Sequence, residues 1–113
     1  MSKERILVLS DLQDFSHIVA KKAIELGKTY KKGIDVLHVE DESILRFFKE
    51  KTEDSFVKSK AILETMYNDN AEIYCKCGNF IDTIKEHIEQ NHISLVIVGF
   101  KRERTFMEDI FNG

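Results

Sequence analysis

Proline is absent from this chain, glycine is scarce, and only two residues are cysteines. With five glycines and 42% hydrophobic residues among 113, the composition excludes a proline- or glycine-rich disordered segment. It is typical of one globular domain over residues 1–113. The lack of a disulfide framework fits a reducing compartment.

Long apolar runs and excess positive charge are also missing. The first apolar run, Ile6 to Leu9, is much shorter than a signal-peptide core or a membrane span. Lysine and arginine number 17 against 20 aspartates and glutamates, which gives a net charge of −3. Because affinity for nucleic acid depends on excess positive charge, we expect neither nucleic acid nor a membrane as partner. We expect a cytoplasmic protein.

Apolar runs that predict strands alternate with segments of helical periodicity. The strands are expected at Arg5–Ser10, Ile34–Val39, Ala71–Cys77 and Ser94–Val98. This alternation predicts a three-layer α/β/α fold with a doubly wound parallel sheet, and right-handed crossovers fit the strand order 3-2-1-4. The last strand is apolar on both faces, so we expect it to be covered on both sides.

The helices are predicted from caps and from apolar spacing. One is expected to begin at Ser16, one to run from about Asp54 to Tyr67, and one to follow an Asn79 cap. A short helical insertion is expected within residues 44–48. A further helix is expected to begin at Thr105, with an apolar face that a partner or a second copy would cover.

Several side chains have metal-binding chemistry, but their spacing does not favour a metal site. Cys75 and Cys77 fall on one face of a strand, at neither a redox nor a zinc spacing. We expect them to pack as small apolar side chains under a helix; oxidation or capture of a soft metal is the alternative. His38 is expected to be a hydrogen-bonded core histidine, and His87 and His92 do not share a helix face.

A ligand crevice is expected where the strand order reverses, between the first and fourth strands. Asp11 directly follows the first strand and Gly99 directly follows the fourth. An aspartate there can accept from a ribose hydroxyl or help to hold a metal, and a glycine lets a ligand approach the backbone. The alternative is that both residues only shape turns.

The order of these segments resembles the universal stress protein family. The resemblance is carried by Ile6–Asp11 with Ser16, then Ile34–Val39, Cys77–Phe80 and Leu95–Gly99, and it covers nearly the whole chain. It implies an adenine nucleotide alpha hydrolase-like fold of five parallel strands, which usually forms a homodimer through the last strand. Here the fourth helix and fifth strand are incomplete, so we expect a second copy or a partner protein to cover strand four.

The resemblance also implies a ligand and a set of residues that hold it. The implied ligand is ATP with magnesium, and the implied binding residues are Asp11, Val36, Leu37, Val98, Gly99, Arg102 and Gly113. The family's phosphate motif is incomplete, because Arg102 stands where its second glycine belongs. An arginine there would crowd a cradle of backbone amides, or it could pair with a phosphate directly.

Three functions fit the sequence. We favour a regulatory domain that acts by association, with or without an adenine nucleotide, and is not an enzyme. The first alternative is an ATP-binding universal stress protein that hydrolyses ATP slowly. The second is a receiver-like signalling domain, but Cys77 and Gly78 stand where a receiver needs its phosphoacceptor aspartate.

Overall fold

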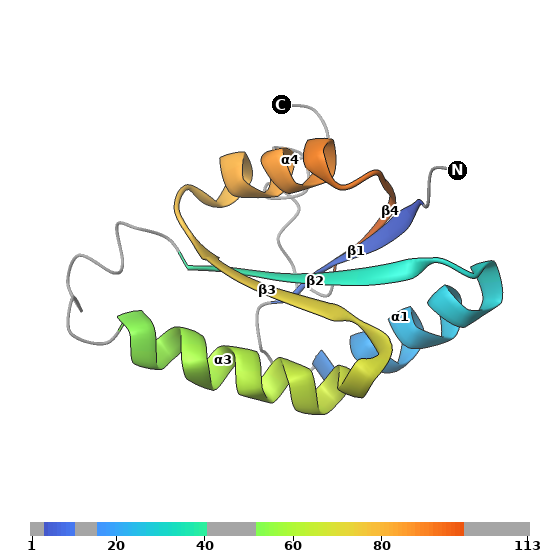
Figure 1. Ribbon diagram of the computed structural model, residues 1–113, viewed down its shortest axis with the longest axis horizontal. Helices are drawn as coiled ribbons and strands as arrows, with labels where there is room; N and C mark the ends of the chain where they lie inside the picture. The colour runs from blue at the N-terminus through green and yellow to red at the C-terminus, as the bar shows by residue number, and fades with distance from the viewer. Residues whose placement is uncertain (1–3, 11–15, 41–51, 99–113) are drawn as a thin grey trace.

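Four parallel strands form the central sheet of the protein. A computed structural model describes residues 4–10, 16–40 and 52–98. The strands are β1 (Arg5–Leu9), β2 (Gly33–Glu40), β3 (Glu72–Cys77) and β4 (Ile93–Val98), in the order β3-β2-β1-β4 (Figure 1). The predicted fold class and strand order are confirmed.

Helices cover both faces of this sheet. Helices α1 (Ser16–Tyr30) and α3 (Thr52–Tyr67) lie on one face and α4 (Phe80–Gln90) lies on the other (Figure 1). A short 3-10 helix, η2 (Asn68–Asn70), links α3 to β3. The predicted insertion at 44–48 and the predicted helix from Thr105 lie outside the described residues.

The sheet side chains divide into two apolar layers because successive residues of a strand point to opposite faces. The layer under α1 and α3 is formed by Ile6, Val8, Ala20, Ala23, Ile34, Val36, Leu63 and Tyr67. The layer under α4 is smaller in its buried part and consists of Leu7, Leu9, Leu37 and Ile84. The single helix α4 therefore buries less of the sheet face that it covers than α1 and α3 together bury of the opposite face.

Local sequence signals set the ends of the elements. The Asn79 side chain accepts a hydrogen bond of 3.0 Å from the Asp82 amide, so the predicted N-cap of α4 is confirmed. Lys31, Asn68 and His92 have positive φ angles of 55°, 53° and 51° in the turns that lead into β2, β3 and β4. Such turns let each helix reverse into the next strand.

The expectation that the last strand is covered on both faces is wrong. β4 is the edge strand that the predicted order implies, and on one of its faces the Leu95 side chain is 40% exposed. An apolar run alone does not show whether both faces of a strand are covered.

A buried polar network ties α4 to the sheet. The Arg5 Nε atom donates to Asp35 Oδ1 at 2.7 Å, and His87 Nε2 lies 2.9 Å from Asp35 Oδ2. The side chains of Asp35 and His87 are 0% exposed. Because an ionised carboxylate only accepts, His87 carries its proton on Nε2. The Tyr74 ring meets the imidazole edge-on, with 4.8 Å between the ring centres.

Opposing effects act on the Asp35 carboxyl. Burial alone would raise its pKa, but the hydrogen bonds from His87 and Arg5 outweigh burial and hold the pKa below the ordinary value of 3.8. A depressed folded-state pKa stabilises the fold above the unfolded-state pKa. That stability is lost as the pH falls through the lower folded-state value.

Asp35→Asn should therefore destabilise the protein in a pH-dependent way. At pH 7 we expect a loss of about 3 kcal/mol or more, because the change removes one partner of a buried ion pair. The difference from wild type should shrink below about pH 4, as wild type loses the same carboxylate interactions. Urea unfolding followed by circular dichroism, repeated at several pH values, measures the loss of stability at pH 7 and its decrease at low pH. Asp69→Asn, at an exposed aspartate, is the control, and a difference that stays constant down to pH 3 would contradict this account.

Candidate ligand site at the carboxyl edge of the sheet

The winding of the sheet reverses at β1. From β1 the chain passes through β2 to β3 on one side, and then crosses to β4 on the other side of β1. All neighbouring strands are parallel, so their carboxyl ends meet at one edge. Such a reversal opens a crevice where the connecting segments diverge, and it is the usual ligand position in this class of fold. The predicted side-by-side placement of β1 and β4 is confirmed.

β2 extends farther at this edge than β1. The β1–β2 pairing ends at Leu9 opposite Leu37, and the β1–β4 pairing ends at Leu9 opposite Val98. The β2–β3 pairing continues to Glu40 opposite Cys77. Residues 38–40 of β2 therefore pass beyond the end of β1 at the edge where the crevice is expected.

Backbone hydrogen bonds show which way the peptide groups of this extension point. The Leu37 carbonyl accepts from the Ser10 amide at 3.1 Å, and the Glu40 carbonyl accepts from the Gly78 amide at 3.0 Å. The backbone carbonyl of Leu37 thus points toward β1, and that of Glu40 points toward β3. Since peptide groups alternate between the two sides of a strand, the N–H and C=O of Val39 point to the β1 side, beyond Leu9.

His38 holds the end of β1 against β2. Its Nδ1 atom lies 3.1 Å from the Ser10 carbonyl, near the place where a continued ladder would meet Val39. Its Nε2 atom lies 3.9 Å from Glu40 Oε1. The expectation of a hydrogen-bonded histidine is confirmed, although this one lies at the edge of the core.

The residues predicted for the site lie partly within the described structure. Val36 and Leu37 are buried within β2, and Val98 is the half-buried last residue of β4. Their contact with a ligand stays a prediction. Four further predicted positions lie outside the described residues: Asp11, Gly99, Arg102 and Gly113. Sequence reasoning missed Val39, because only the unequal lengths of β1 and β2 distinguish it from its neighbours.

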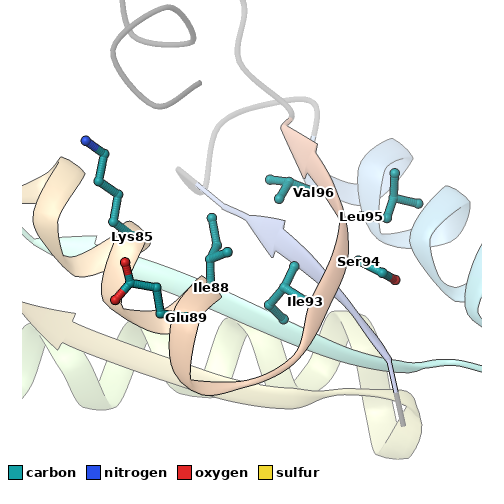
Figure 2. A pocket seen from close by; sticks show the side chains of 7 residues that line it. All are labelled: Lys85, Ile88, Glu89, Ile93, Ser94, Leu95 and Val96. Carbon is teal, nitrogen blue, oxygen red and sulfur yellow. The ribbon is translucent and has the colours of Figure 1, made fainter. Parts of the chain in front are cut away.

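A hollow lies away from this edge, between α4 and β4. It has a volume of about 540 Å³ and is lined by Lys85, Ile88, Glu89, Ile93, Ser94, Leu95 and Val96. Figure 2 shows the side chains of Ile88 on α4 and of Ile93 and Val96 on β4 lining this groove between the helix and the edge strand. The groove follows from the single helix on this face and from the edge position of β4.

Metal-binding and membrane-spanning features were sought in the same part of the chain. Among residues 4–10, 16–40 and 52–98, no three His, Cys, Asp or Glu side chains gather closely enough to hold a metal ion. No helix within these ranges is long and apolar enough to cross a membrane.

Comparison with known proteins identifies the architecture. No protein-family model matches the chain, and no curated protein does. Solved structures do match: a universal stress protein from Archaeoglobus fulgidus in complex with dAMP has a TM-score of 0.72 and 16% identity, covering 99% of this chain and 92% of that one. The chain has the fold of the universal stress proteins.

Two further structures with the universal stress fold agree. The universal stress protein UspA from Lactobacillus plantarum has a TM-score of 0.62 and 17% identity, over 93% of this chain and 82% of that one. A universal stress protein in complex with cAMP has a TM-score of 0.59 and 13% identity, covering 98% of this chain and 83% of that one.

The two cysteines lie beside the crevice on β3. Cys75 pairs with His38 and Cys77 with Glu40, so both thiols share one face as predicted. The expectation that both pack under a helix is wrong for Cys77, which is exposed, while Cys75 is half-buried. Burial, aided by the nearby Glu40 carboxylate, raises the pKa of the Cys75 thiol.

We expect the two thiols to differ in reactivity. With iodoacetamide at pH 8, Cys77 should be alkylated several-fold faster than Cys75, because Cys75 is less exposed and forms less thiolate. The variants Cys75→Ser and Cys77→Ser each leave one thiol and form a matched pair, and mass spectrometry gives the rates. Equal rates, or faster reaction at Cys75, would contradict this placement.

Proposed function

We propose that this protein is a regulatory domain of the universal stress type that binds an adenine nucleotide and acts by association, without turnover. The observation that carries the proposal is the extension of β2 beyond β1 at the point where the sheet reverses. Universal stress proteins of this fold occur in complex with dAMP and with cAMP, which supports the choice of ligand class.

The base would be read by the Val39 peptide. Adenine carries an acceptor, N1, beside a donor, its 6-amino group, so the N–H and C=O on one side of a strand can pair with both. Both groups of Val39 point to the β1 side of β2. Peptide groups at an unpaired strand edge are common recognition elements for extended and planar ligands.

The sugar and phosphates would be held by the segments that continue from β1 and β4. In this proposal Asp11 accepts from a ribose hydroxyl, and Gly99 lets a phosphate approach the backbone. Arg102 pairs with phosphate oxygens through its planar guanidinium, and Gly113 completes the loop. Magnesium would neutralise part of the charge of ATP when bound.

Association is the proposed mode of action. The sequence has no serine elbow between glycines and no lysine-bearing phosphate loop, so we assign no catalytic residue. The edge position of β4 and the exposure of Leu95 favour a second copy or a partner protein on this side. We propose that the domain acts in the cytoplasm, where ATP is plentiful.

Asp11→Ala should abolish stabilisation by Mg-ATP. A ligand at one hundred times its Kd stabilises a protein by about 2.7 kcal/mol, which raises the Tm of a small domain by roughly 10 °C. We expect a rise of that order in wild type and little or none in Asp11→Ala, as measured by differential scanning fluorimetry.

The control is Asp69→Ala, which removes a carboxylate at the opposite edge of the sheet and should keep the full shift. If wild type is stabilised by neither ATP, ADP nor AMP, nucleotide binding is ruled out. Steady release of inorganic phosphate from ATP, lost in Asp11→Ala, would instead favour the hydrolytic alternative.

A further inference from the structure

The peptide that follows β1 is held on both sides by β2. The Ser10 amide donates to the Leu37 carbonyl at 3.1 Å, and the Ser10 carbonyl lies 3.1 Å from His38 Nδ1. A carbonyl oxygen can only accept, so His38 must carry a hydrogen on Nδ1. The contact thus defines the tautomer of the neutral ring as well as the position of Ser10.

His38 is a firm support for this contact. Its side chain is only 12% exposed, and its strand is paired on the far side with β3, where Cys75 lies opposite His38. The last residue of the strand is fixed too, because the Gly78 amide donates to the Glu40 carbonyl at 3.0 Å. The imidazole is therefore attached to the rigid part of the sheet.

The two hydrogen bonds of Ser10 act on different peptide planes. The Ser10 amide belongs to the plane shared with Leu9, which the ladder already orients. The Ser10 carbonyl belongs to the next peptide plane, the last one in this described segment of the chain. The His38 hydrogen bond orients the carbonyl of this plane.

We propose that His38 is a positioning residue for the nucleotide site: by donating from Nδ1 to the Ser10 carbonyl, it holds the end of β1 in place beside the Val39 peptide that would read the base. This role rests on the proposed function. His38 acts through Ser10 and need not touch the ligand. The specific requirement is a donor at Nδ1, while Nε2, which faces Glu40, is not used.

Two substitutions of similar polarity distinguish the role of His38 Nδ1 from that of Nε2. In His38→Asn the amide nitrogen can take the place of Nδ1, whereas in His38→Gln it reaches the place of Nε2. We expect AMP affinity, measured by isothermal titration calorimetry, to fall on the order of two- to tenfold in His38→Gln, the range for one neutral hydrogen bond, and to be largely retained in His38→Asn. His92→Asn, at the opposite edge and with a positive φ that asparagine tolerates, is the control and should bind as wild type does.

A second measurement needs no variant and no ligand. Nitrogen-15 NMR of the imidazoles at about pH 8.5, well above the ordinary pKa of histidine, should find a hydrogen of His38 on Nδ1. A hydrogen on Nε2 alone would overturn the proposal even if both variants fail to fold. Equal AMP affinity in the two variants, with binding intact in wild type, would overturn the positioning role alone. No binding in wild type would overturn the proposed function and this role with it.

Discussion

The unequal reach of β1 and its neighbour β2 is the constraint on which the rest of this account depends. β1 lies in the middle of the sheet, paired on both sides, and its pairing stops at Leu9. β2 continues to Glu40 because β3 supports it to its end. The described pairings of β1 end at this step while β2 continues, so backbone polar groups of β2 lie beyond the end of β1.

The opposite edge of the sheet is built for stability. There the Asp35 carboxylate is buried between Arg5 and His87 and joins β1, β2 and α4 through two short hydrogen bonds. Such a network is costly to leave incomplete, so it fixes how α4 sits on a sheet face that only one helix covers. The network therefore fixes α4 at the amino edge, away from the carboxyl edge where the proposed site lies.

Much of the fold could be predicted from local sequence, and the site only in outline. Apolar runs located the four strands, and the Asn79 cap located the start of α4, because these signals lie within a few residues. The bond between Asp35 and His87 joins residues 52 apart and could not be read from spacing. The overhang of β2 at Val39 depends on where each strand pairing ends, which composition does not encode. Cys77 was misjudged for the same reason, since the helix above β3 covers Cys75 more fully.

The most direct test of the account is to map where an adenine nucleotide binds. Titration of AMP into nitrogen-15-labelled protein should shift the backbone amide signals of Ser10, Val39 and Val98 most strongly, because these residues surround the end of β1 at the carboxyl edge. Shifts concentrated around Arg5, Gly33 and Glu72, at the amino edge, would contradict it. So would shifts confined to the groove between α4 and β4.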